Sequence, residues 1–269
     1  MNRPSASSSS RWPLPADDDW STPFAELLLE QLDLRPGLTI LDIACGHGIP
    51  AFYLAEQVGP TGSVLGIDAS RGQVANARTI QRGELPWLRY ECVDMRALPA
   101  SLPTFQRITG NLSVMFLRPH RFEAMRGLIE HLEPGGQVVL TFPSLGTFDS
   151  IWQRIDHEMS RHGLTRERER LAAYVAERPS AAEARGWLEQ LQMERIDVIE
   201  RPLEVASGSG QRFLQHPLLR GGFLDDAYEC FEDDRLADTV MTSVAADLES
   251  MTPLTARRCA LSGWKRGQA

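Results

Sequence analysis

The chain has 269 residues, a formal net charge of −8 and four cysteines. This length suits one doubly wound domain with additions, and the acidic balance argues against a nucleic-acid partner, which would require a basic surface. No apolar run approaches the length of a membrane span, and no two cysteines form a Cys-x-x-Cys pair. We therefore expect a cytoplasmic protein with reduced thiols, no metal site and no nucleic-acid or membrane partner.

Residues 1–16 are rich in serine and close with two prolines, so we expect them to form a flexible tail. An amphipathic pattern then predicts a helix over 24–32. The apolar run 38–41 leads into Asp42 and a Gly-x-Gly turn at 46–48, after which helical spacing resumes. A strand, a glycine loop and a helix start in this order bind the phosphate or carboxylate end of a cofactor in open α/β sheets.

A second apolar run, 64–67, ends in Asp68. An acid about 20 residues beyond the glycines is placed to accept hydrogen bonds from ribose hydroxyls. Two nucleoside cofactors fit this pattern: a nicotinamide dinucleotide, and one with a positive charge near the glycine loop. Asp42 disfavours the dinucleotide, because its carboxylate would face the pyrophosphate. The single lysine is Lys265 and residue 261 is leucine, so the Tyr-x-x-x-Lys pair of short-chain dehydrogenases is excluded.

Helical and extended patterns alternate along the rest of the chain. The helical patterns cover 71–81, 121–132 and 180–191. A capping box from Ser180 to Glu183 marks the start of the third. The extended patterns cover 87–93, 105–110, 137–142, 196–205 and 256–264. Alternation of this kind predicts an α/β protein with a mainly parallel sheet and helices on both faces.

The segments around the glycine loop resemble, in order, the motifs of class I S-adenosylmethionine (SAM) dependent methyltransferases. The matching segments are 20–38 (first helix and turn), 41–48 (first motif), 66–70 and 91–95 (ends of strands two and three), 105–116 (strand four) and 131–140 (turn into strand five). The resemblance implies a doubly wound, mostly parallel seven-stranded sheet of the Rossmann-like methyltransferase fold, with an antiparallel hairpin of the last two strands. It also implies SAM as the cofactor and S-adenosylhomocysteine as its product.

Two segments, 146–178 and 207–250, are insertions between the expected strands and do not belong to that sheet. Insertions after the carboxyl ends of strands lie over the cofactor crevice, so we expect a helical cap that closes over the acceptor; helices that pack elsewhere for stability are the alternative. The expected organisation is a tail (1–16), a SAM-binding core (17–145, continued over 179–206), the two cap insertions, and a final core strand (251–269).

The resemblance assigns cofactor roles by position. The acid of the first motif would hold the methionine ammonium, the two glycines would let the backbone approach the cofactor, and the acid after strand two would bind the ribose. Two residues after strand three would bind adenine, and the asparagine after strand four would lie beside the sulfonium. The tryptophan before the first helix would cover the cofactor or pack against the cap. The expected cofactor-binding residues are Trp20, Asp42, Gly46, Gly48, Asp68, Ala69, Asp94, Met95 and Asn111.

The acceptor side is less defined. Candidate bases are His120, His216 and Tyr228, whereas His47 in the glycine turn is expected to face solvent. Segments 141–156 and 213–222 resemble the malonyl-carrier-protein and trans-aconitate O-methyltransferases, which methylate a carboxylate held by arginine. This finer resemblance implies a substrate-binding role for the arginines of those segments, Arg154, Arg212 and Arg220. The alternative is that they are ordinary surface cations of an arginine-rich chain.

The leading interpretation is a SAM-dependent methyltransferase with a small-molecule acceptor. The expected methylation site on the acceptor is an oxygen, either of a hydroxyl group or of a carboxylate. After Asn111 the chain continues Leu-Ser-Val, not Pro-Pro-Tyr, which argues against methylation of a nucleic-acid amine. Two alternatives stay open. One is a regulatory or cyclase-like protein that binds SAM without transferring methyl, and the other is a nicotinamide-dependent oxidoreductase.

Overall fold

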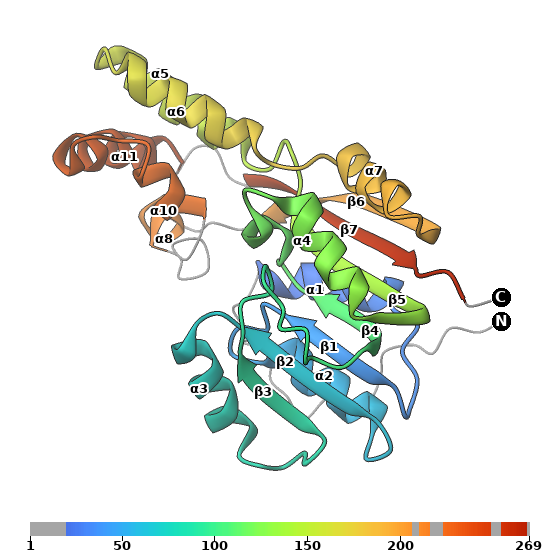
Figure 1. Ribbon diagram of the computed structural model, residues 1–269. Helices are drawn as coiled ribbons and strands as arrows, with labels where there is room; N and C mark the ends of the chain where they lie inside the picture. The colour runs from blue at the N-terminus through green and yellow to red at the C-terminus, as the bar shows by residue number, and fades with distance from the viewer. Residues whose placement is uncertain (1–19, 206–209, 216–222, 249–253, 268–269) are drawn as a thin grey trace.

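The computed structural model describes residues 20–205, 210–215, 223–248 and 254–267, arranged around one seven-stranded sheet (Figure 1). The strands are β1 (Thr39–Ile43), β2 (Ser63–Asp68), β3 (Leu88–Cys92), β4 (Phe105–Gly110), β5 (Leu132–Pro143), β6 (Glu194–Val205) and β7 (Leu254–Trp264). Their order is β3-β2-β1-β4-β5-β7-β6. The first five are parallel, and β7 is antiparallel to both β5 and β6. The predicted α/β fold class is confirmed.

Helices cover both faces of the sheet, because both faces are apolar. One face carries α1 (Ser21–Gln31), α2 (Ile49–Val58) and α3 (Arg71–Gln81), and the other carries α4 (Arg121–Glu130) and α7 (Ala181–Gln190). The predicted capping box starts α7: the Ser180 hydroxyl accepts a hydrogen bond from the Glu183 backbone N–H, and the Glu183 carboxylate accepts one from the Ser180 N–H. The fold therefore has an apolar core on each side of the sheet.

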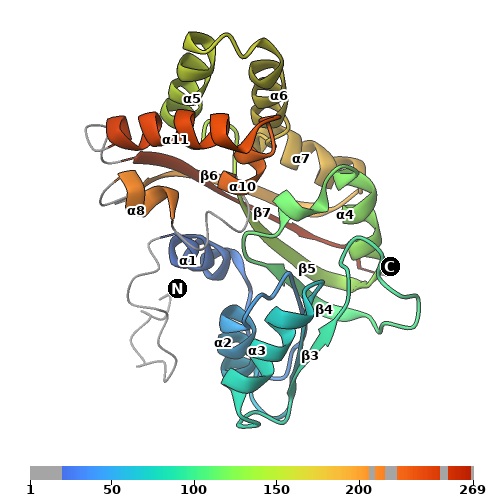
Figure 2. The ribbon, with the colours of Figure 1, turned by 90° about the vertical axis from the view of Figure 1, so that its left-hand side faces the viewer.

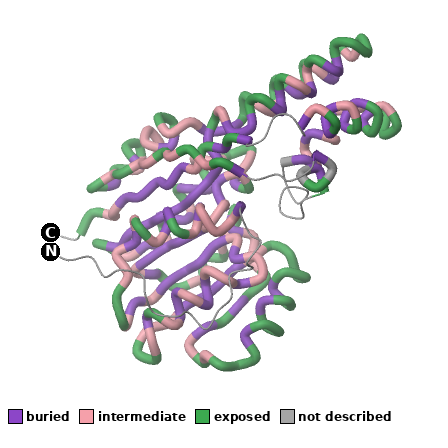
Figure 3. The backbone as a smooth tube through the Cα atoms, turned by 180° about the vertical axis from the view of Figure 1, so that it is seen from behind, coloured by how far each residue is buried: buried purple, intermediate pink, exposed green. Residues whose placement is uncertain are grey.

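The segments beyond the sheet form a third group of helices, here called the cap, past the carboxyl ends of the parallel strands (Figures 1 and 2). The cap consists of α5 (Asp149–Arg161), α6 (Thr165–Ala176), α8 (Gly210–Leu214), α10 (Phe223–Tyr228) and α11 (Asp234–Leu248). A third apolar core joins these helices to Trp20 and Phe24 at the start of the described chain. Burial is nearly continuous along the central strands β1, β2 and β4, whereas it alternates with exposure along the cap helices (Figure 3).

The largest difference from the expected boundaries is at β5. β5 begins at Leu132, before the Pro-Gly-Gly turn that was expected to precede the strand. A shift of register against β4 accommodates this turn, in which Gly135 has φ +76° and bonds through its N–H to the carbonyl of Lys265 on the neighbouring chain end. None of the helices in the described ranges has both the length and the apolar character that crossing a membrane requires.

Candidate cofactor-binding site

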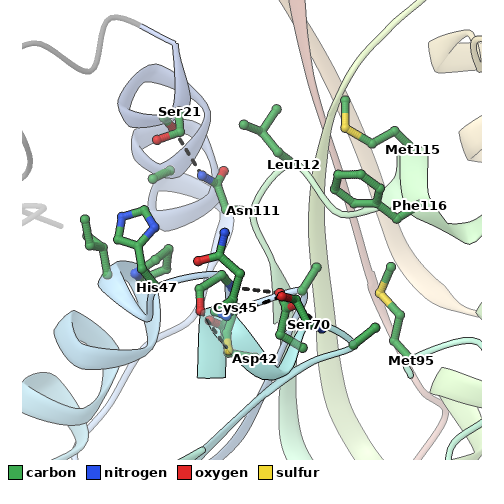
Figure 4. A pocket seen from close by; sticks show the side chains of 18 of the residues that line it. Ser21, Asp42, Cys45, His47, Ser70, Met95, Asn111, Leu112, Met115 and Phe116 are labelled. Carbon is green, nitrogen blue, oxygen red and sulfur yellow. Dashed lines mark hydrogen bonds between the residues drawn. The ribbon is translucent and has the colours of Figure 1, made fainter. Parts of the chain in front are cut away.

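A pocket of about 560 Å³ opens at the carboxyl ends of β1, β2 and β4 (Figure 4). Ligands of open α/β sheets bind in the crevice at this edge, where the strand order reverses. Eight of the nine residues expected to bind the cofactor are among its lining: Trp20, Asp42, Gly46, Asp68, Ala69, Asp94, Met95 and Asn111. The structure thus brings together residues that are up to about ninety positions apart in the sequence, as the Asn111 bond to Ser21 illustrates.

The glycine loop leaves β1 in a conformation that only glycine adopts easily. Gly46 and Gly48 have φ values of +54° and +89°. A Cβ on Gly46 would meet no atom within 4 Å, whereas a Cβ on Gly48 would overlap the ring of Tyr90. The Tyr90 hydroxyl donates to the Gly48 carbonyl at 3.1 Å. Gly48 therefore does not line the pocket; it starts α2 and allows the loop to pack closely on β3.

Asp42 is 1% exposed and lies at the end of β1. Its Oδ1 accepts a hydrogen bond from the Thr109 hydroxyl at 2.8 Å, while Oδ2 has no partner among the described residues. Burial raises its pKa to about 7, and the charge of Asp68 adds to the rise. An unpaired carboxylate oxygen at the wall of a pocket fits a cationic ligand group such as an ammonium, because such a group would supply the missing partner.

The other two acids already have partners. Asp68 accepts hydrogen bonds from the backbone N–H groups of Gly46 at 2.9 Å and Ser70 at 2.8 Å, which ties the glycine loop to the end of β2. Asp94 forms a two-pronged ion pair with Arg96, with the shortest contact at 2.7 Å, and this pairing lowers its pKa. Each carboxylate oxygen has further lone pairs, so both acids can still accept from a ligand.

Asn111 and Trp20 connect the pocket to other parts of the fold. The Asn111 side chain donates to the Ser21 carbonyl at 3.1 Å and accepts from the Thr141 hydroxyl at 2.8 Å, so it joins α1 to β5. Trp20 is 2% exposed and stacks on Phe148 of the cap with ring centres 5.3 Å apart. It lines the pocket and packs against the cap as well, so both positions expected for this side chain occur together.

Some lining residues were not expected from the sequence. His47 is half-buried and lines the pocket, so its side chain is only partly exposed to solvent. Met115 and the 47% exposed Phe116 come from the short 3-10 helix η1 (Val114–Leu117) after β4. An apolar turn after β4 was visible in the sequence, but its direction depends on the left-handed φ of +54° at Leu112.

The acceptor-side candidates that the structure describes lie elsewhere. His120 is exposed before α4, and Tyr228 packs against the cap core; neither lines the pocket. Arg154 pairs with Asp247 across α5 and α11 instead of facing the pocket. Arg212 is exposed on α8. The remaining two candidates, His216 and Arg220, lie outside the described residues.

The pocket offers polar contacts rather than a nucleophile of its own. Burial, together with the charges of Asp42 and Asp68, raises the pKa of the Cys45 thiol, which therefore stays neutral and unreactive. Within the described ranges no cluster of three or more His, Cys, Asp or Glu could hold a metal ion.

The strand order and this pocket define an α/β protein that binds a nucleoside cofactor. Residues 40–136 match a family described as Methyltransferase domain. The methyltransferase GfsG of Streptomyces halstedii is 33% identical over 150 residues, covering 52% of this chain and 52% of GfsG. The aklanonic acid methyltransferase DauC of a Streptomyces species is 32% identical over 139 residues, covering 48% of this chain and 60% of DauC. The chain thus spans about half the length of these relatives.

Solved structures agree on the fold. The YcgJ protein of a Bacillus species superimposes with a TM-score of 0.57 at 16% identity, and the superposition covers 92% of this chain and 100% of the YcgJ chain. The [4+2]-cyclase SpnF has a TM-score of 0.54 at 21% identity and covers 91% of this chain and 82% of its own. The matched region, residues 40–136, is a methyltransferase domain of the class I SAM-dependent type, and SAM is the cofactor of this class.

Proposed function

We propose that the chain transfers the methyl group of SAM to an oxygen of a small-molecule acceptor. The observation that carries the proposal is the buried Asp42, whose Oδ2 has no partner among the described residues and lies at the pocket that the methyltransferase resemblance assigns to SAM. The names of the relatives, of which one acts on aklanonic acid, support a small-molecule acceptor. Cytoplasmic location and the absence of a nucleic-acid partner stay predictions.

The residues of this chain would hold the cofactor at both ends. When bound, SAM supplies an electrophilic methyl group on a sulfonium. Asp42 would bind the methionine ammonium, Asp68 the ribose hydroxyls, and the segment at Asp94 and Met95 the adenine. Much of the acceleration of such an in-line displacement comes from holding the two reactants aligned. Phe116, which is exposed at the mouth of the pocket, would contact the acceptor.

The cap would exclude water from the reaction. Trp20 lines the pocket and at the same time belongs to the apolar core of the cap, so the cap packs directly against the wall of the pocket. We therefore propose that the two insertions close over the acceptor, with the residues of 17–145, 179–206 and 251–269 as the SAM-binding core. A carboxylate acceptor would need no base, and for a hydroxyl acceptor His47 is the one imidazole among the residues that line the pocket.

Calorimetric titration with SAM, S-adenosylhomocysteine and NADH tests the cofactor, and transfer of labelled methyl from SAM to a panel of small acids and phenols tests the activity. We expect the first two ligands to bind and NADH not to bind, followed by label in at least one acceptor. Binding of SAM without methyl transfer to any acceptor would favour the alternative of a SAM-binding protein that transfers no methyl group. The cyclase SpnF is an example of a protein of another activity with this fold. Binding of NADH alone would reject the proposal.

A further inference from the structure

A second cavity, of about 160 Å³, lies beside the cofactor pocket and shares Met115 and Phe116 with it. We call it the arginine pocket, because three guanidinium groups line it: Arg118 after η1, Arg121 at the start of α4, and Arg178 after α6. Two carboxylates, Glu177 and Asp226, and apolar side chains including Phe142 complete the wall. The shared residues place the two cavities next to each other.

The arginine pocket holds charges of both signs. Arg118 bonds to Asp226 at 3.1 Å and to Glu177 at 3.4 Å, so it engages both carboxylates of the lining. From outside the lining, Glu183 acts on Arg121 and Asp149 acts on Arg178. Burial lowers the pKa of both Arg121 and Arg178, although an arginine keeps its charge in proteins. A ligand is therefore favoured by a donor that lacks a partner, not by net charge.

Arg178 is held in one position. It is 7% exposed, its guanidinium lies over the rings of Trp152 at 4.3 Å and Tyr174 at 5.0 Å, and it donates to the Thr147 carbonyl at 2.9 Å. A guanidinium held against two aromatic rings and a carbonyl loses little freedom when it binds a ligand. This side chain therefore forms a preorganised wall of the cavity.

Arg121 supplies a donor that the protein itself does not use. Its Nε is buried and has no hydrogen-bond partner among the described residues. A buried donor without a partner costs free energy that a ligand can recover. An Arg fork matches the two oxygens of a carboxylate, which makes a carboxylate the fitting ligand group.

We propose that the arginine pocket binds a carboxylate of the acceptor, which serves as an anchor, while a different atom of the acceptor receives the methyl group. This rests on the proposed function, because it assigns the substrate class of the same enzyme: an acid with an apolar body that lies across Phe116. The carboxylate is assigned as an anchor because the arginine pocket is a separate cavity from the cofactor pocket, where the methyl group of SAM would lie; the two share Met115 and Phe116 in their linings.

Ligand-observed NMR titrations on protein saturated with S-adenosylhomocysteine test the anchor. The probes are two matched pairs, benzoate with benzamide and hexanoate with hexanamide, at millimolar concentrations. We expect both acids to bind and the amides to bind at least fivefold more weakly. Arg121→Gln should remove most of this preference, and Arg121→Lys should keep part of it. Arg126→Gln is the matched control, because Arg126 is exposed on the same helix and lines neither cavity.

Each outcome separates this inference from the proposed function. Three results would overturn the anchor: equal binding of acids and amides by the unmodified protein, no binding of either acid, or acid binding that survives Arg121→Gln. None of these results would affect the cofactor titrations. Failure of S-adenosylhomocysteine to bind would reject the proposed function, while the acid–amide comparison can still be made without it. Labelled methyl ester formed from benzoate itself would overturn the assignment of the carboxylate as an anchor. The acid–amide comparison in the unmodified protein does not depend on whether a variant folds.

Discussion

The cofactor pocket and the arginine pocket lie side by side but are built in different ways. The cofactor pocket is made by loops that directly follow β1, β2, β3 and β4, so each of its acids lies within a few residues of a strand end. The arginine pocket combines the turn before α4 with the ends of cap helices, and its ion pair from Arg118 to Asp226 spans 108 positions. Local sequence patterns reveal the first kind of site, whereas only the folded chain reveals the second.

The largest effect is expected from a substitution that disrupts the glycine loop of the cofactor pocket and leaves the arginine pocket intact. Gly48→Ala places a Cβ on the Tyr90 ring at a left-handed φ of +89°, and we expect it to lower the free energy of unfolding by about 2–5 kcal/mol. Gly46→Ala has the backbone strain but no overlap, so it should cost about 1–2 kcal/mol. Urea unfolding measures both, and equal losses would show that the Tyr90 contact is not limiting.

The second prediction separates cofactor binding from acid binding. Asp68→Ala removes a carboxylate that orders the Gly46 N–H and faces the pocket, so the affinities for SAM and S-adenosylhomocysteine should both fall by about 1.5–3 kcal/mol. Calorimetry measures the loss, with Asp68→Asn as the control that keeps one acceptor oxygen. Benzoate binding to the cofactor-free variant should not change. If both cofactor affinities were unchanged, the ribose role of Asp68 would be wrong.

The same contrast explains how much the sequence could predict. The limits of α3 and β4 agree with the expected 71–81 and 105–110, and the Ser70 cap marks the start of α3 locally. Eight expected site residues line the pocket because strand-end positions share one edge of a parallel sheet. Arg121 and Arg178 carry no local signal, since what distinguishes them is burial and neighbours from other elements. The place of His47 in the pocket wall has the same origin, because the direction of a loop side chain depends on tertiary packing.

The third prediction uses pH to test the unpaired oxygen of Asp42. Because burial raises its folded pKa from 3.8 to about 7, the cofactor-free protein gains stability from this group at low pH and loses it as pH rises from about 4 to 7. A bound ammonium requires the ionised form, so SAM affinity should fall about tenfold per unit as pH drops below 7. Asp42→Asn should bind SAM weakly and without this pH dependence. Calorimetry at several pH values checks both, and a pH-independent affinity in the unmodified protein contradicts the ammonium contact.

The smallest expected effect concerns Arg154, the arginine whose segment resembles carboxylate-binding methyltransferases. Its ion pair with Asp247 joins α5 to α11, and both side chains are about one-third exposed. Arg154→Gln should therefore cost only about 0.2–1 kcal/mol of stability, as expected for a solvated pair. Benzoate binding should be unchanged, in contrast to Arg121→Gln. If Arg154→Gln instead abolished acid binding, the anchor would lie under the cap helices, and the arginine pocket would be a structural cluster only.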